Sequence, residues 1–241
     1  MGPLYSLYDY LMSIDAVFFD LDYTLFDSEA SEREALNMTL LDNGVPPTDE
    51  AITLYKAINR SLWEMLEREA IDLEYLRVNR FEQLLEVLEE TKNPKSLADS
   101  YTTNLGKCGR FYPETKPLLE RLQGKAKLAI VTNGVSETQR LRLEIHDYER
   151  YFDAVVVSGE FGIPKPNPAI FNEALNLLGL SEDENVMMVG DSLSSDMEGA
   201  RLSGLISCWF NPDSDRDTTD VDVDYTIQSL SDLVEILNIG N

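Results

Sequence analysis

The chain is poor in basic residues. Its 241 residues include 44 acidic and 20 basic side chains, which gives a formal net charge of −24 at pH 7. Such an acidic protein repels nucleic-acid backbones and anionic membranes at long range. We therefore expect neither as a partner, and an anionic ligand has to be held by a local positive feature such as a metal ion, a lysine or a helix N-terminus.

Cysteine and histidine are also scarce. The two cysteines, Cys108 and Cys208, lie in unrelated contexts without metal-ligand spacing, which is typical of reduced thiols in a cytosolic protein. The single histidine, His146, stands beside charged residues and is expected at the surface.

Long apolar runs are missing as well. None approaches the roughly 18 residues that a membrane span needs, and residues 1–13 lack the basic and apolar regions of a secretory signal. We predict a cytoplasmic location, with residues 1–13 as an extension outside the fold. Apolar residues still make up 43% of the chain, which is ordinary for a folded globular protein.

Short apolar runs alternate with amphipathic segments over most of the chain. Nearly every residue of these runs is apolar, which is typical of strands buried on both faces of a parallel sheet. The runs cover residues 16–19, 128–131, 154–157, 186–189 and 206–210.

Helix signals separate the runs. Asn167 and Pro168 supply an N-cap and a first-turn proline for a helix that stops at Gly179. Ser136 and Gln139 have the spacing of a capping box at the start of another helix. The alternation predicts an α/β fold, a doubly wound parallel sheet with right-handed crossovers.

Residues 27–110 interrupt this alternation because they contain no strand signal. Two stripes of apolar residues at helical spacing predict helices there: Leu54, Ile58, Leu62 and Met65, then Phe81, Leu84, Leu85 and Leu88. We expect about four inserted helices. The predicted architecture is an α/β core of residues 1–26 and 111–241, with an all-α cap of residues 27–110.

Polar side chains follow the predicted strands: Asp20, Asp22, Thr24, Thr132, Asn133, Asp191 and Asp196. In an open parallel sheet, ligands bind beyond the carboxyl ends of the strands, so these side chains should lie close together. Lys165, in a later loop, can reach the same place. Several carboxylates beside one lysine are costly without a cation, and oxygen ligands of this kind suit Mg²⁺.

The spacing of Asp20 and Asp22 suggests a division of labour. They stand two residues apart where the first strand ends. One carboxylate can act as nucleophile and metal ligand, and aspartyl-phosphates are among the covalent intermediates that carboxylates form. The other can act as general acid and then as general base.

Four segments resemble, in order, the motifs of the haloacid dehalogenase (HAD) superfamily. Residues 20–25 resemble its Asp-x-Asp-x-Thr motif, and residues 132–134, 165–166 and 190–196 resemble its three later motifs. The helical insert after the first motif is similar to the C1 cap of subfamily I. The resemblance covers about residues 14–240 and implies a HAD Rossmann-like core with this cap.

The resemblance implies a role for each motif residue. Asp20 would attack phosphorus, and Asp22 would protonate the leaving oxygen and later activate water. Thr132 and the Asn133 backbone would hold phosphoryl oxygens, and Lys165 would neutralise their charge. These groups suit phosphoryl transfer, which depends mainly on positioning and electrostatic stabilisation.

The same resemblance implies a magnesium site. The ligands would be the Asp20 carboxylate, the Asp22 main-chain carbonyl and Asp191. Asp196 would support the metal, directly or through water.

Shorter segments resemble the HAD pyrimidine 5′-nucleotidases, namely residues 59–63, 79–81 and 208–212. This resemblance implies a pyrimidine nucleoside 5′-monophosphate as substrate. The candidate substrate contacts in the cap are Arg60, Trp63, Arg80 and Phe81. Aromatic residues at helical spacing are also typical of a helical core, and the two arginines also fit surface ion pairs.

Alternative functions stay open at this point. The protein would be a monomer or homodimer that binds a small phosphorylated metabolite, and a sugar phosphate or phosphoglycolate could replace the nucleotide. A haloacid dehalogenase is disfavoured because the pattern of those enzymes lacks an equivalent of Asp22. A mutase would have to exclude water from the phosphoenzyme, and no such barrier is indicated. The cap and the paired Asp191 and Asp196 argue against a non-enzymatic receiver or interaction protein.

Overall fold

The computed structural model describes residues 14–68, 70–181, 183–212 and 222–239. The predicted extension, residues 1–13, lies outside the described residues. Within these ranges, no helix combines the length and the apolar character needed to cross a membrane.

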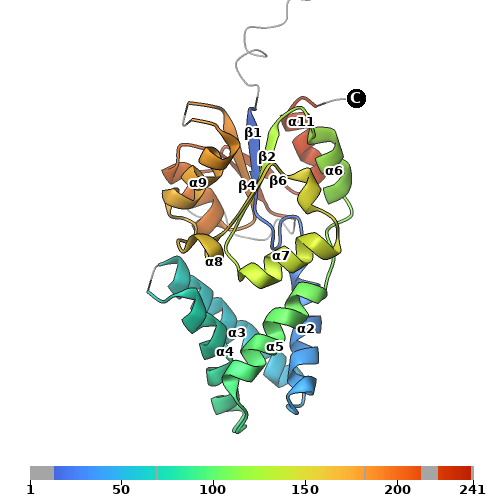
Figure 1. Ribbon diagram of the computed structural model, residues 1–241, viewed down its shortest axis with the longest axis vertical. Coiled ribbons are helices and arrows are strands. Elements are labelled where there is room, and N and C mark those ends of the chain that lie inside the picture. Colours follow the sequence, from blue (N-terminus) through green and yellow to red (C-terminus); the bar gives the residue numbers. More distant parts are fainter. Residues whose placement is uncertain (1–13, 69, 182, 213–221, 240–241) are drawn as a thin grey trace, which may run out of the picture.

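A parallel sheet of six strands forms the core (Figure 1). The strands are β1 (Ala16–Phe19), β2 (Lys127–Thr132), β3 (Ala154–Val157), β4 (Val186–Gly190), β5 (Ile206–Phe210) and β6 (Tyr225–Ile227). Each of the five apolar runs forms one of the first five strands. The order is β3-β2-β1-β4-β5-β6, so the direction of winding reverses between β1 and β4, where doubly wound sheets bind ligands.

Helices cover both faces of the sheet, which explains why the strands are apolar throughout. In β1, Val17 and Phe19 belong to one buried cluster, and Ala16 and Phe18 belong to the other. The first cluster includes side chains of α6 (Thr115–Leu122), α7 (Ser136–Ile145), η3 (Leu230–Asp232) and α11 (Leu233–Ile236). The second includes side chains of α9 (Pro168–Leu178) and α10 (Glu198–Leu202). The remaining short elements are η1 (Glu149–Tyr151), α8 (Ser158–Phe161) and η2 (Leu193–Met197).

Both predicted helices form at the expected positions, but only one of them has the predicted cap. Asn167 caps α9 by accepting a hydrogen bond from the Ala169 N–H, and the helix ends at Gly179 in the left-handed conformation. The capping box at Ser136 does not form, because α7 has no side-chain cap. The Gln139 side chain is instead turned toward the sheet, where it meets a carboxylate described below.

Four helices form the cap: α2 (Ser28–Asp42), α3 (Asp49–Glu67), α4 (Leu73–Val87) and α5 (Pro94–Lys107). They lie together beyond the carboxyl ends of the strands (Figure 1). The apolar stripe expected on α3 is partly wrong, since Met65 is 39% exposed. The buried positions of α3 are Ala51, Tyr55, Asn59, Leu62 and Leu66, so this face contains polar and aromatic residues that the stripe omitted.

The chain passes between core and cap twice, and the two crossings lie side by side. Phe26 and Phe111 form an isolated antiparallel bridge, and the Asp27 N–H donates to the Arg110 carbonyl at 2.9 Å. His146 was expected at the surface but is partly buried, because its ring packs edge-on against Phe26 and Phe111. The crossings therefore form a short, packed double connection.

Candidate active site

A cavity of about 540 Å³ lies between the core and the cap, within the usual size range of ligand pockets. Its core side includes most of the predicted polar residues: Asp20, Asp22, Asn133, Lys165, Asp191 and Asp196. Its cap side includes residues from all four cap helices. Thr132 and Thr24 are buried and do not line it.

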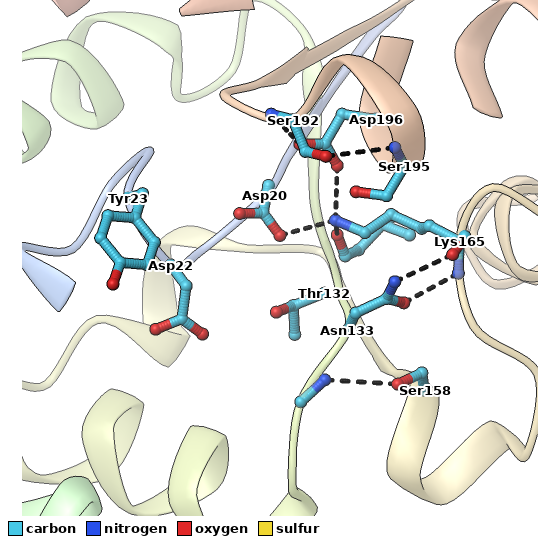
Figure 2. A network of polar contacts seen from close by, with 12 residues as sticks. Asp20, Asp22, Tyr23, Thr132, Asn133, Ser158, Lys165, Ser192, Ser195 and Asp196 are labelled. Carbon is cyan, nitrogen blue, oxygen red and sulfur yellow. Dashed lines mark hydrogen bonds and ion pairs between the residues drawn. The ribbon is translucent and has the colours of Figure 1, made fainter. Parts of the chain in front are cut away.

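Lys165 lies at the centre of the core side (Figure 2). Its Nζ atom donates to Asp20 Oδ1 and Asp196 Oδ1, both at 2.6 Å, and to the Val131 carbonyl at 2.8 Å. These three bonds use every N–H of the ammonium group. Burial alone would lower the pKa of Lys165, but the Asp196 and Asp20 carboxylates hold it above its ordinary value. Lys165 is therefore a fixed positive charge.

Negative charge exceeds positive charge around this lysine. Carboxylate oxygens of Asp20, Asp191 and Asp196 all lie within 4.8 Å of one another. Burial keeps the pKa of Asp20 well above its usual range, although Lys165 opposes this effect. Three oxygen donors in one cluster fit a magnesium ion, which binds carboxylates and retains water ligands. The residues present therefore fit the predicted cation.

Local structure fixes the two later aspartates. Asp196 lies in the π-helical turn η2, and its Oδ2 accepts from the Ser192 N–H at 3.0 Å. A Cβ atom at Gly190 would collide with the Asp196 carboxylate, so glycine is required there. The Asp191 carbonyl accepts from Trp209 Nε1 at 2.9 Å, which ties the end of β4 to β5.

Asn133 holds the loop that carries the lysine. Its Oδ1 accepts from the Lys165 N–H at 2.8 Å, and its Nδ2 donates to the Lys165 carbonyl at 2.9 Å. Figure 2 shows these two parallel bonds. The end of β2 therefore positions the lysine backbone, and the lysine side chain reaches back to the end of β1.

Asp22 has a different orientation from Asp20. Its carboxylate is turned away from the Asp20 carboxylate (Figure 2). Oδ1 accepts from Ser28 Oγ and from Arg142 Nη1, and Oδ2 accepts from Gln139 Nε2, each at 2.5 Å. Burial would raise the pKa of Asp22, but Arg142 and these hydrogen bonds hold it below its ordinary value. Asp22 is thus ionised in this arrangement, and both of its carboxylate oxygens accept hydrogen bonds.

Arg142 is a site residue that no pattern in the sequence indicated. It is 1% exposed and also contacts the cap, because Nη2 donates to Ser31 Oγ and Nε donates to the Leu105 carbonyl, both at 3.3 Å. Its guanidinium group lies 4.4 Å from the centre of the Phe26 ring. Arg142 therefore joins Asp22 to both ends of the cap insertion.

The predicted cap contacts divide into two groups. Arg60, Trp63 and Arg80 line the cavity. Phe81 does not, because it is fully buried in the cap core against Tyr55 and Tyr101, at ring-centre distances of 5.4 and 5.5 Å. We therefore correct the prediction that Phe81 contacts substrate. The cap side of the cavity also includes three residues that were not singled out, Glu32, Asn59 and Tyr101.

The fold and the site together define an enzyme with a capped, doubly wound α/β core, with acidic groups and a buried lysine at the reversal point of its sheet. Residues 17–210 match the model of the haloacid dehalogenase-like hydrolases, and the chain belongs to that family.

Named relatives place the chain among the phosphatases of the family. It is 34% identical to the pyrimidine 5′-nucleotidase YjjG of Escherichia coli, over 94% of this chain and 99% of the relative. It is 31% identical to the pyrimidine 5′-nucleotidase PynA of Streptococcus pneumoniae, over 91% and 93%. The magnesium-bound structure of the Bacillus subtilis HAD-hydrolase YfnB has a TM-score of 0.87 and 31% identity, over 94% of this chain and all of that one. The protein is a phosphatase of the HAD family.

Proposed function

We propose that this phosphatase is a magnesium-dependent phosphomonoesterase that works through a phosphorylated Asp20. The observation that supports this most is the contact of Asp20 with Lys165 beside Asp191 and Asp196. These groups form a carboxyl nucleophile, a fixed cation and a metal-type cluster in one cavity. Such a set combines covalent catalysis with electrostatic stabilisation.

The proposed reaction has two steps. An Asp20 carboxylate oxygen attacks phosphorus, the ester P–O bond breaks, and the leaving oxygen takes a proton from Asp22. Water then attacks the phosphorus, gives a proton to Asp22, and the bond between phosphorus and Asp20 breaks. Because Arg142, Ser28 and Gln139 hold Asp22, the acid role requires Asp22 to leave these partners and take a proton.

Asp20, Asp191 and the Asp22 main-chain carbonyl would hold the magnesium ion, with Asp196 in support. When bound, the ion supplies positive charge to the phosphoryl oxygens. Lys165 would neutralise further charge, and Asn133 keeps it in place through the backbone.

The cation requirement can be tested by chelation. Activity on nitrophenyl phosphate should disappear in excess EDTA and return with Mg²⁺. Ca²⁺ should restore little, because it accepts more ligands at longer distances and would misplace Asp20. Full turnover of nitrophenyl phosphate after chelation would contradict the proposed magnesium requirement.

The substrate that we propose is a pyrimidine nucleoside 5′-monophosphate. Two relatives with this named activity align over most of the chain. The cavity also has room and partners for a nucleoside beside the phosphoryl site, since Trp63 lies in its cap side and one base stacked on an aromatic ring is worth roughly 1–3 kcal/mol.

A substrate panel tests this choice. We expect kcat/KM for uridine or thymidine monophosphate to exceed the values for a purine monophosphate, a hexose phosphate and phosphoglycolate. If any of these three is preferred by about tenfold, a difference of ~1.4 kcal/mol, the nucleotidase proposal is wrong. The protein would then be a phosphatase for another small metabolite.

A further inference from the structure

Each cap helix contributes at least one polar side chain to the cap side of the cavity. Four of these side chains, one from each helix, are Glu32 of α2, Asn59 of α3, Arg80 of α4 and Tyr101 of α5, and we call these four the cap wall. These residues are separated by 21 or more positions in sequence, so only the packing of the four helices brings them together. The phosphoryl chemistry proposed above uses none of them.

Arg80 is buried without a carboxylate partner. It is 4% exposed and donates from Nη1 to Asn59 Oδ1 at 3.2 Å. Among the described residues, it has no ion pair within 4 Å, and its Nε has no hydrogen-bond acceptor. The guanidinium group instead lies 4.6 Å from the centre of the Tyr101 ring. An arginine held by an aromatic ring and an amide keeps donors available for a ligand.

Glu32 supplies an acceptor in the same wall. Its carboxyl group accepts a hydrogen bond from the Tyr23 hydroxyl and lies within electrostatic range of Arg80 and Arg142. No lysine or arginine of the described chain lies within 4 Å of its oxygens in an ion pair. Burial, together with the charge of Asp22, raises the pKa of Glu32 to about 7. The group is therefore a carboxylate at mildly alkaline pH.

We propose that the cap wall recognises the edge of a neutral ring that presents a carbonyl oxygen next to an N–H, as uracil and thymine do. Arg80 donates to the carbonyl oxygen, and Glu32 accepts from the ring N–H. Asn59 holds the guanidinium group in position. This assignment rests on the proposed nucleotidase function and adds the base that the enzyme selects.

The same wall disfavours cytosine. At the corresponding positions cytosine carries an amino group and an unprotonated ring nitrogen, so that donors face Arg80 and a lone pair faces Glu32. Selectivity arises as much from such mismatched pairs as from good contacts. A site that uses buried polar groups leaves them unpaired with the wrong ligand, which costs more than the loss of an apolar contact.

The test compares kcat/KM for uridine monophosphate, cytidine monophosphate and ribose 5-phosphate. The wild type should prefer the uridine nucleotide to the cytidine nucleotide by at least about tenfold. Arg80→Met should lower the value for uridine monophosphate by about 10- to 100-fold, as expected for a lost charged hydrogen bond. Ribose 5-phosphate carries no base, so its value should stay within about twofold.

Arg77→Met is the matched control. Arg77 lies on the same helix, pairs with Glu74 and Asp99, and does not line the cavity. It should leave all three substrates within about twofold of wild type.

Glu32→Gln provides a second, isosteric variant. An amide both donates and accepts, so the preference for uridine over cytidine monophosphate should fall toward one. Glu34→Gln, on the exposed side of α2, should leave that preference unchanged.

Three results separate the possible failures. An equal loss for ribose 5-phosphate in Arg80→Met would show that Arg80 only supports the cap fold, and would overturn the proposal. An unchanged uridine-to-cytidine ratio in both variants would overturn it too. A wild type that prefers ribose 5-phosphate to both nucleotides would instead refute the proposed nucleotidase function itself.

Discussion

The core and the cap line the same cavity in different ways. On the core side, Lys165, Asp20 and Asp196 satisfy one another through short hydrogen bonds. On the cap side, Arg80 lies against aromatic rings and leaves a buried donor unpaired. The charged groups of the core side thus satisfy one another, whereas the cap side has hydrogen-bonding capacity left for a ligand.

This difference suggests a division of function. Groups that end parallel strands are fixed by the backbone of the sheet, which suits chemistry that depends on position. Groups on a separate helical unit can differ without disturbing that chemistry. We therefore expect core substitutions to affect every substrate alike, and cap substitutions to affect substrates according to what they carry beside the phosphate.

The strongest test of this contrast is Asp20→Asn. Turnover should fall by at least about three decades for nucleotides, sugar phosphates and nitrophenyl phosphate alike, because the nucleophile and a metal ligand are lost together. Thermal unfolding should stay close to wild type and serves as the control. A loss confined to nucleotides would contradict the assignment of chemistry to the core.

Arg142 connects the core to the cap, and a substitution at this position tests that connection. Arg142→Met removes the buried partner of Asp22 and two contacts to the cap insertion. Removing one partner of a buried pair is strongly destabilising, and because Asp22 is only partly buried we expect a loss of about 2–4 kcal/mol in the free energy of unfolding, measured in urea.

Arg140→Met is the control on the same helix. Arg140 pairs with Glu149 and Glu160 at the surface, and exposed pairs contribute at most about 1 kcal/mol. Equal losses for the two variants would mean that Arg142 does not join core and cap.

A smaller effect concerns the change of protein stability with pH, in which Glu32 should differ from exposed acidic residues. Its folded pKa of about 7 lies above the ordinary value of 4.5, so the folded protein binds a proton more tightly than the unfolded chain. The contribution of Glu32 to stability is therefore fully present below pH 4.5 and is lost as pH rises through 7. Glutamine does not ionise in this pH range. The free energy of unfolding of Glu32→Gln, relative to that of wild type, should therefore rise by about 2–3 kcal/mol between pH 5 and pH 8.

Urea unfolding of both proteins at the two pH values, with EDTA present, measures this gain. Glu34→Gln should show none. If the difference between Glu32→Gln and wild type does not change with pH, then Glu32 is not the buried acid that the cap wall requires.

The core residues of the site could be predicted because the sheet brings sequence-local features together. Asp20, Asn133 and Asp191 each follow an apolar run, and the carboxyl ends of parallel strands meet at one edge. The four motifs were therefore enough to place most of the charged groups. Trp209 was missed as a support for Asp191, since an apolar strand residue gives no sign of the hydrogen bond that its ring makes.

The partners of Asp22 and the cap wall could not be predicted in the same way. Gln139 and Arg142 lie three residues apart on α7, a spacing that also fits a capped surface helix, and only tertiary packing turns them toward Asp22. Arginine is rarely fully buried, so the environment of Arg80 was not expected. Phe81 was misassigned because an aromatic residue at helical spacing fits a core as well as a pocket.

The central claim is that Asp20 carries the phosphoryl group, and direct trapping tests it best. In Asp22→Asn, nitrophenyl phosphate should still phosphorylate the enzyme, because its leaving group needs little protonation, whereas hydrolysis lacks its general base. Acid quenching and peptide mass spectrometry should then find one added phosphoryl group, on Asp20. A phosphoryl group on another residue, or a burst of nitrophenol without any phosphorylated peptide, would contradict the account.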